Sequence, residues 1–119
     1  MATRNVSASY NPNGQRNAVL YTWTGLLNGD QGSAVEAADW ADRTVQIAGT
    51  FGVGGSVTLE GSNDNSNWVA LTDPQGNAVT KTAAGLEVFE EGPRYIRPNV
   101  TAGDGTTSLT VTVWARRGR

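Results

Sequence analysis

The chain has 119 residues, with 15 glycines, a single lysine, no cysteine and no histidine, and its formal net charge is −2. A chain of this length forms one domain with its own core, and the lack of cysteine excludes disulfides and thiolate metal sites. No stretch approaches the ~20 apolar residues of a membrane span, and residues 1–16 have no apolar signal-peptide core, so we predict no membrane partner.

Charge is distributed unevenly along the sequence. Residues 1–16 hold Arg4 and Arg16 without any acid, and the last four residues hold three more arginines, among them Arg116 and Arg117. The net charge of −2 is therefore the balance of five terminal arginines against a body of net −7. Such an acidic body repels phosphate, which argues against a nucleic acid partner. The basic ends either stay solvated or meet another acidic protein surface, including a second copy of this chain.

The N-terminal segment differs from the rest of the chain. Residues 1–16 are polar, contain Pro12 and Gly14, and show no hydrophobic period. We therefore expect an extended N-terminal arm that is disordered alone and becomes ordered on a partner. Residues 17–119 then form a single β-sandwich domain that ends in a short basic tail.

From Asn17 onward, short segments alternate apolar and polar side chains and are separated by turn residues. In residues 43–51, Val45, Ile47 and Phe51 face one way, and threonine and glutamine face the other. This period of two predicts β-strands, and turns about every 8–12 residues are typical of a β-sandwich. The predicted strands are residues 18–27, 43–51, 56–61, 68–72, 78–82, 86–90, 94–101 and 108–115.

Two segments need a separate argument. Residues 33–43 contain Ser33 and Glu36 at the spacing of a helix capping box but lack an apolar stripe, so a short strand at 34–37 and a loop are favoured. Pro98 has no N–H to donate to a ladder, which predicts that its strand lies at a sheet edge. The sequence thus predicts an all-β fold, an antiparallel, jelly-roll-like β-sandwich of about eight or nine short strands.

The side chains that most often perform catalysis are missing. Without histidine and cysteine, the chain lacks the commonest general base, the thiol nucleophile and the usual transition-metal ligands. Asp104 and the stretch from Asp64 to Asn67 offer oxygen ligands, but their spacing does not match a calcium loop. We therefore expect no enzyme, no cofactor and no metal. A pair of carboxylates could still act together, and the candidates, whose positions indicate solvated surface, are Glu60, Asp64, Asp39 and Asp42.

Three stretches together resemble one protein family. They are DRTVQIAGTFG at 42–52, GSVTLEGSND at 55–64 and the run at 73–117. Over roughly residues 17–117, the chain resembles small head proteins of tailed bacteriophages, the capsid cement or decoration proteins with a jelly-roll-like β-sandwich. The resemblance implies a structural protein that binds the outside of a shell of major capsid proteins, stabilises contacts between capsomers and associates with its own copies as a dimer or trimer. It also implies a place on the virion exterior after assembly in the host cytoplasm, and it brings no catalytic residue.

Candidate contact residues lie near both ends of the chain and on one late strand. Arginines suit the carboxylates of a partner, and tyrosine and tryptophan suit the buried anchors of an interface. Trp114 lies opposite the apolar side of its strand, so it is an anchor if that face is exposed and a core residue if both faces are buried. For the other candidates, the alternative is that they are ordinary surface residues of a strand or of a chain end. The predicted interface residues are Arg4, Tyr10, Arg16, Arg94, Tyr95, Arg97, Trp114, Arg116 and Arg117.

A carbohydrate-binding module is the alternative. Residues 56–73 read SVTLEGSNDNSNWVALTD, in which a strand enters a polar loop and a tryptophan returns on the next strand. This pattern resembles discoidin-like carbohydrate-binding sandwiches. In that case Trp68, Trp23 or Trp40 would be the platform on which a sugar stacks, beside Asp64 and Asn67.

Overall fold

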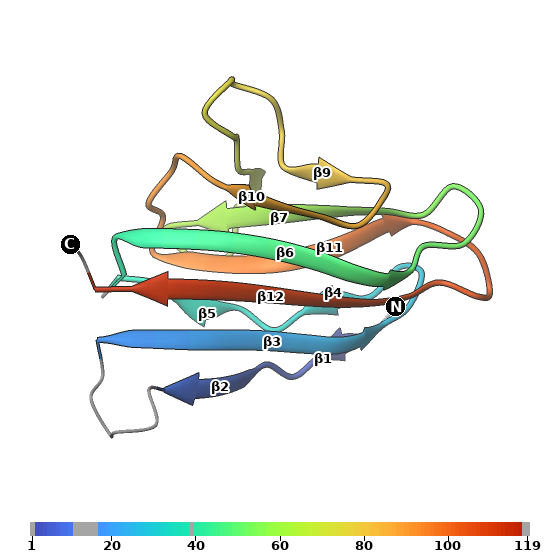
Figure 1. Cartoon of the computed structure of the whole chain (residues 1–119), viewed down its shortest axis with the longest axis horizontal. Helices are drawn as coiled ribbons and strands as arrows, with labels where there is room; N and C mark the ends of the chain where they lie inside the picture. The colour runs from blue at the N-terminus through green and yellow to red at the C-terminus, as the bar shows by residue number, and fades with distance from the viewer. Residues whose placement is uncertain (1, 11–16, 39, 118–119) are drawn as a thin grey trace.

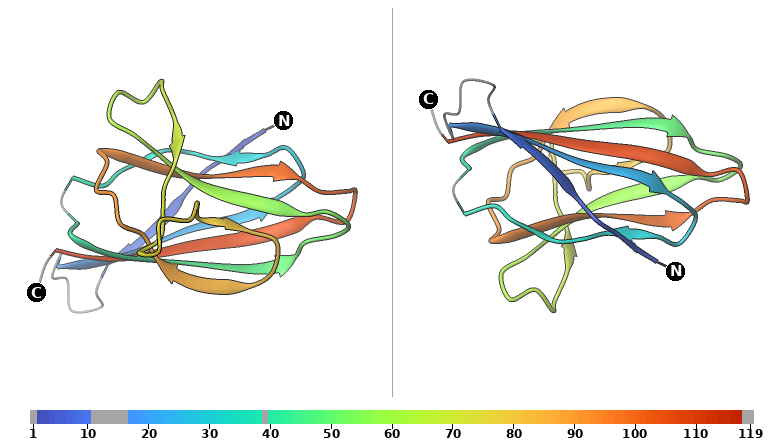
Figure 2. Two further views of the ribbon diagram at one scale, coloured as in Figure 1. Left: turned by 90° about the horizontal axis from the view of Figure 1, so that it is seen from above. Right: turned by 90° about the horizontal axis from the view of Figure 1, so that it is seen from below.

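Alternation of buried and exposed side chains produces two β-sheets that share one core. The structure is a computed structural model and describes residues 2–10, 17–38 and 40–117. Within these residues the chain forms twelve strands, and the two sheets pack face to face as a sandwich (Figure 1). Figure 2 shows the two layers from their edges. The described part of the chain contains no helix long and apolar enough to cross a membrane.

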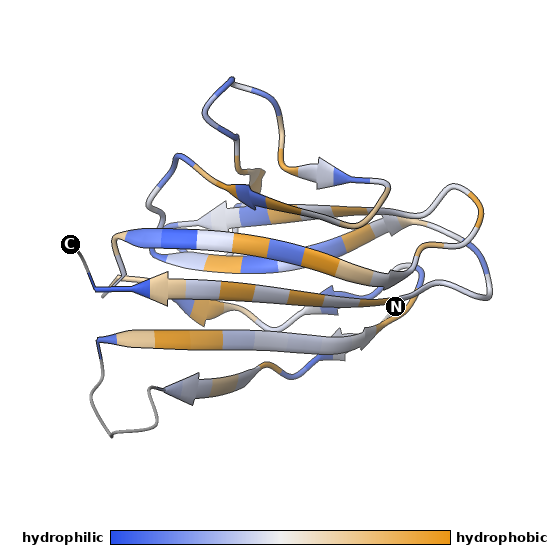
Figure 3. Cartoon of the chain, viewed as in Figure 1, coloured by the Kyte–Doolittle hydropathy of each residue, from blue (hydrophilic) through white to orange (hydrophobic). Residues whose placement is uncertain are grey.

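The first sheet has five strands in the order β10–β6–β12–β3–β2, and all neighbouring pairs are antiparallel. Along β12, Val111 and Val113 are buried while Thr110 and Thr112 are partly exposed on the other side. The same alternation is visible as coloured bands along β6 and β12 (Figure 3). The strands are β2 (Ser7–Tyr10), β3 (Ala18–Leu26), β6 (Asp42–Thr50), β10 (Gly85–Val88) and β12 (Ser108–Arg116).

The second sheet has seven strands along the path β1–β4–β11–β7–β8, and β5 pairs with β11 while β9 pairs with β7. Its pairs are antiparallel except for β1 with β4, which run parallel. Most of these strands are short, and only β7 and β11 are long enough to carry a regular alternation. They are β1 (Thr3–Arg4), β4 (Gln31–Gly32), β5 (Val35–Glu36), β7 (Ser56–Ser62), β8 (Val69–Ala70), β9 (Thr80–Lys81) and β11 (Tyr95–Ala102).

The core is centred on Trp23, which is fully buried between the sheets. The indole Nε1 of Trp23 donates a hydrogen bond to the carbonyl of Ser33 at 2.9 Å, which satisfies its only polar atom. Gly32 lies directly against this ring, since a Cβ at position 32 would stand 2.5 Å from the indole Cδ1. Aliphatic side chains from both sheets complete the core, among them Val19, Leu26, Val45, Ile96, Val100, Leu109 and Val113.

The predicted fold class is confirmed, because the described chain forms an all-β sandwich of two sheets. The long alternating segments became β3, β6, β7, β11 and β12, and residues 33–43 contain the short strand β5 rather than a helix. The strand number is higher than the predicted eight or nine, because the structure also forms β1, β2 and β4. These strands lack a hydrophobic period, so they could not be recognised from the sequence.

Pro98 lies in an interior strand, contrary to the prediction from its sequence. It stands opposite Leu59 in the pairing of β11 with β7. Leu59 uses its N–H and carbonyl on the far side of β7, toward Val79 and Leu71. Pro98 and Leu59 are therefore a pair without mutual hydrogen bonds, and the ring Cδ, which is bonded to the proline nitrogen, lies against Gly32 of β4. The missing N–H is tolerated because β4 pairs with β11 only at Asn99 and Gln31, so no ladder hydrogen bond is required from Pro98.

Residues 2–10 lie along the body of the molecule. β1 joins the seven-stranded sheet and β2 joins the five-stranded sheet, so this dark-blue segment crosses from one layer to the other (Figure 2). The carboxylate of Asp30 holds its beginning, accepting hydrogen bonds from the Ala2 N–H at 3.0 Å and from the Arg4 Nε at 2.8 Å. The expectation that residues 1–16 order only on a partner therefore does not hold for residues 2–10, and residues 11–16 lie outside the described part.

Candidate interaction surfaces

The outer side of the five-stranded sheet is broad and exposed, and the charges at its described strand positions are confined to Arg116 and Asp42, which pair with each other at one end. Residues that alternate with the core positions on all five strands point to this side, and the register aligns them in rows. Apart from Asp42 and Arg116 at one end, most of them are threonine or serine, some are apolar, and none is charged. We call this surface the threonine face. It consists of Ser7, Ser9, Leu20, Thr22, Thr24, Thr44, Gln46, Ala48, Leu86, Val88, Thr110, Thr112 and Trp114.

Trp114 lies on β12, the middle strand of the threonine face. The register places Trp114 between Leu20 on β3 and Thr44 on β6, and Thr44 pairs in turn with Val88. Trp114 is 42% exposed and Val88 is 49% exposed, so both keep apolar surface in solvent. Of the two readings that the sequence left open for Trp114, the structure shows the exposed one. An exposed tryptophan within an uncharged surface has the character of an interface anchor.

The outer side of the seven-stranded sheet is instead covered by paired charges. The Nε of Arg97 donates to Glu60 Oε1 at 3.0 Å, and the guanidinium lies 4.1 Å from the centre of the Trp68 ring. The second oxygen of Glu60 accepts a hydrogen bond from the Asn99 amide at 3.2 Å. These charges are already compensated within the molecule, and the Arg97 and Glu60 side chains are only 19% and 16% exposed, so they offer a partner no unpaired charge.

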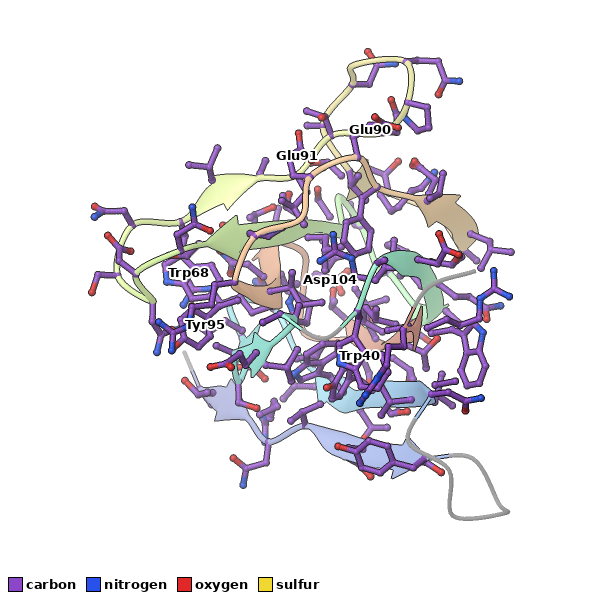
Figure 4. The ribbon with its side chains drawn as sticks, turned by 90° about the vertical axis from the view of Figure 1, so that its left-hand side faces the viewer. Trp40, Trp68, Glu90, Glu91, Tyr95 and Asp104 are labelled. Carbon is purple, nitrogen blue, oxygen red and sulfur yellow. The ribbon has the colours of Figure 1, made fainter. Side chains whose placement is uncertain are left out.

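Arg94 and Tyr95 extend this charged surface. The Arg94 guanidinium lies 5.1 Å from the centre of the Tyr95 ring and pairs with Glu36 at 3.4 Å. Figure 4 shows Tyr95 and Trp68 on the same side of the molecule. The structure therefore brings the predicted ridge of Arg94, Tyr95 and Arg97 together on one face. Its contact with a partner stays a prediction.

The predicted contact residues near the chain ends are spread over the surface. Arg4 is held by Asp30, and Tyr10 lies on the edge strand β2, where it is 37% exposed. Arg116 pairs with Asp42 at 3.2 Å, next to the threonine face, and Arg117 lies 5.8 Å from the centre of the Trp40 ring. Arg16 lies outside the described residues.

A hollow of about 520 Å³ opens between the loop after β7 and residues 91–93. Asp64 and Glu91 line it, but both carboxylates also stabilise the surrounding chain. Asp64 accepts hydrogen bonds from the N–H groups of Asn67 and Ser66, and these bonds hold its pKa well below the usual range. Burial raises the pKa of Glu91, but the bonds from Thr72 outweigh it and the net pKa is lowered. Glu90 and Glu91 lie together in Figure 4.

The carboxylates considered as calcium ligands likewise accept hydrogen bonds from nearby loop residues. Asp104 accepts hydrogen bonds from the Thr106 hydroxyl at 2.7 Å and from the Val53 N–H at 2.9 Å. These donors lower the pKa of Asp104 to about 2. Among residues 2–10, 17–38 and 40–117, no three acidic side chains gather closely enough to hold a metal ion.

Arg43 is a buried cation beside residues 89–92. Its Nη2 donates to the carbonyl of Glu91 at 2.6 Å, and its guanidinium lies 4.9 Å from the centre of the Phe89 ring. The Nε and Nη1 atoms have no hydrogen-bond partner within the part of the chain that the structure describes. Burial lowers the pKa of Arg43. Its contacts attach the segment after β10 to β6.

The tryptophans considered as a sugar platform do not form one surface. Trp23 is fully buried and Trp40 is 7% exposed, with its Nε1 donating to the Tyr21 hydroxyl at 3.1 Å. Trp68 is partly exposed, but Arg97 covers one face of its ring. Figure 4 shows Trp40 inside the sandwich and Trp68 at its side.

The threonine face was missed as a site by the sequence reasoning, although a signal was present. On the strands that became β6 and β12, the outward positions are uncharged except for Asp42, which begins β6, and Arg116, which ends β12. The outward positions of β7 and β11 include Glu60 and Arg97. Only the sheet order shows that the uncharged strands are neighbours and form one continuous surface.

Comparison with known proteins identifies a fold rather than a family. No protein-family model matches the sequence, and no curated protein matches it. Among solved structures, the chain is similar to the SPBc2 prophage-derived protein YomS, with a TM-score of 0.62 at 14% identity. The alignment covers 82% of this chain and 93% of that one. This chain therefore shares its fold with a prophage-derived protein.

Enzymes also occur among the structural neighbours. A cupin-superfamily sugar phosphate isomerase from Silicibacter pomeroyi aligns at 14% identity and TM-score 0.46, covering 93% of this chain and 59% of that one. Hydroxypropylphosphonic acid epoxidase from S. wedmorenis aligns at 11% identity and TM-score 0.46, covering 93% and 49%. The chain thus spans about half to three fifths of these enzymes. This finding overturns the sequence-based exclusion of an enzyme, although such remote similarity assigns no activity to this chain.

Proposed function

We propose that the protein is a structural component of a bacteriophage head. It binds the major capsid protein on the outer surface of the shell, as a cement or decoration protein, and stabilises contacts between neighbouring capsomers. Two findings support this proposal: the fold shared with a prophage-derived protein, and a large uncharged surface that is left uncovered on the sandwich. The resemblance of residues 17–117 to cement proteins agrees with both.

The threonine face is the observation that carries the proposal. It spans three to five residues on each of five strands, which lie ~4.8 Å apart and rise ~3.3 Å per residue, so its area is roughly 350 Å². A stable interface buries about 800 Å² on each partner, so this face provides a little under half of the required area and contacts around it provide the rest. Because no charge must be desolvated there, Trp114, Leu86 and Val88 can be buried at little electrostatic cost.

Repetition around the shell supplies the strength of attachment. A head displays the same capsid surface many times, so each molecule that bridges two capsomers makes its second contact at a high effective concentration. A modest affinity for each contact is then sufficient to hold neighbouring capsomers together. The outer side of the seven-stranded sheet, whose charges are paired within the molecule, faces solvent in this arrangement.

The experiment measures co-sedimentation of the purified chain with empty heads and compares two matched variants. Thr112→Arg places a charge in the middle of the threonine face, and Thr101→Arg places the same charge on the exposed side of β11. We expect Thr112→Arg to weaken binding at least about tenfold, since an unpaired charge becomes buried at the interface, and Thr101→Arg to bind normally. Equal binding by both variants, with unchanged circular dichroism, would contradict the proposed docking face. Absence of binding by the unmodified chain would contradict the proposed function.

A further inference from the structure

The edge strand β10 has an unpaired side. β10 stands last in the order of the five-stranded sheet, and β6 is its only strand partner in the described chain. The golden segment that contains β10 lies at the margin of the molecule in both views of Figure 2. An exposed edge offers backbone N–H and carbonyl groups to another strand, and natural proteins usually protect such edges with outward charges or proline.

The side chains of β10 do not protect this edge. Leu86 is 64% exposed and Val88 is 49% exposed, and both lie on the threonine face. Glu87 points to the opposite side, where it pairs with Lys81 at 3.0 Å, so its charge is compensated within the molecule. The other edge of the sheet, β2, differs because its outward residues are Ser7 and Ser9. β10 is therefore the apolar edge of this sheet.

Strand direction determines how a second copy can pair with this edge. Every neighbouring pair in the sheet is antiparallel, so β10, β12 and β2 all run the same way. Translating a second copy would place β10 beside β2 as a parallel pair of two short strands, which is the weaker arrangement. Rotating it about a two-fold axis instead pairs β10 with its own copy in the antiparallel sense, the usual symmetry of homodimers.

We propose that two copies of this chain associate through β10 about a two-fold axis centred on Leu86. In this register Leu86 lies opposite Leu86 of the second copy, and Gly85 lies opposite Glu87. The alternative register, shifted by two residues, places Glu87 opposite Glu87, which is unfavourable for like charges. The result is one continuous sheet of ten strands, twice the five of each copy.

The dimer gives the proposed function a geometric advantage. A two-fold axis perpendicular to the sheet leaves both threonine faces on the same side, so the docking area doubles and the two copies reach across neighbouring capsomers. The inference deepens the proposed function in this respect, and the dimer itself is measured without any capsid.

Sedimentation velocity of the full chain, over a concentration series into the hundred-micromolar range, tests the dimer. We expect a dimer in the unmodified chain and a monomer for Val88→Lys, which adds a charge beside the paired edges. Val69→Lys is the matched control, because Val69 is an exposed valine, 69% accessible, on the edge strand β8 of the other sheet. It should remain dimeric. Circular dichroism and thermal unfolding of each variant establish that the fold is intact.

A second measurement uses the absence of cysteine from the chain. Under mild oxidation Leu86→Cys should form a disulfide-linked dimer rapidly, whereas Val69→Cys should not, because directly opposed Cβ atoms lie within ~5.5 Å. A monomeric unmodified chain, a trimer, a dimer unaffected by Val88→Lys or equal cross-linking of both cysteine variants would each overturn the inference. A dimer that fails to bind heads contradicts only the proposed function, and a monomer that binds them contradicts only the dimer.

Discussion

The four tryptophans show how burial decides the role of a residue. Trp23 and Trp40 are buried and each indole N–H has a partner inside the sandwich, whereas Trp114 is 42% exposed on the threonine face. Trp68 lies on the outer side of the seven-stranded sheet, where the Arg97 guanidinium covers its ring. The sequence offered Trp114 as an interface anchor and the other three as sugar platforms, and only the packing of the two sheets separated core from surface.

Alanine substitution should separate these roles. Trp23→Ala removes a fully buried ring and is expected to cost about 3–5 kcal/mol of unfolding free energy, measured by chemical denaturation. Trp114→Ala should cost about 1 kcal/mol or less, yet weaken binding to heads at least about tenfold, since it is proposed as an interface anchor. A large loss of stability in Trp114→Ala with unchanged head binding would show instead that Trp114 serves the fold.

Most predicted contact arginines have a partner within the molecule. Arg4, Arg94, Arg97 and Arg116 each form an ion pair with a carboxylate of the same chain. These pairs join residues far apart in sequence, so the positions of the charges along the chain could not reveal them. The exposed pair of Arg94 and Glu36 contributes little stability, whereas Asp30 and Glu60 are mostly covered by the chain. In all four cases the pairing leaves fewer free charges for a partner than the sequence indicated.

At the scale of elements, Asp30 connects the first strand to the body. It is only 4% exposed, and its carboxylate accepts hydrogen bonds from the Leu27 and Ala2 N–H groups and from Arg4. Burial raises the pKa of Asp30, but these donors outweigh it and the net pKa is lowered. A depressed folded-state pKa means that the ionised carboxylate stabilises the native state.

Replacing this carboxylate should loosen β1. Asp30→Asn removes the buried charge that faces Arg4 and is expected to cost about 3 kcal/mol, with faster amide exchange in residues 2–10. In the unmodified chain the contribution is fully present above about pH 5 and is lost as pH falls below the unfolded value of ~3.9 and through the lower folded pKa. Denaturation curves at a series of pH values should therefore converge for the two proteins at low pH. A constant difference between them would refute this account.

At the scale of the whole molecule, the sandwich has two unlike outer sides. The five-stranded sheet presents the uncharged threonine face, with one ion pair of Arg116 and Asp42 at its end. The seven-stranded sheet presents Arg97, Glu60, Arg94 and Glu36 as ion pairs. Each side has one character because sheet order places strands with similar outward residues next to each other. Salt should weaken docking through the arginines, because it screens their charges, and should have little effect on docking through the uncharged side.

Binding to heads should be nearly independent of ionic strength. We expect a change of less than about threefold in affinity between about 0.05 M and about 0.5 M salt, because the threonine face contains no charge to be screened. Sedimentation with heads over a salt series measures this. A steep fall in affinity would identify the arginines near the chain ends as the main contacts and would count against the threonine face.

The sequence alone determined the fold class, because the strict two-residue alternation in segments such as 43–51 and 108–115 is compatible only with strands that bury one side. It did not reveal β1, β2 or the interior place of Pro98, since these depend on backbone partners supplied by distant segments such as Asp30 and β7. Only the tertiary structure decided the order of strands in each sheet. That order determines which outward side chains become neighbours, and a binding surface is a property of neighbours in space.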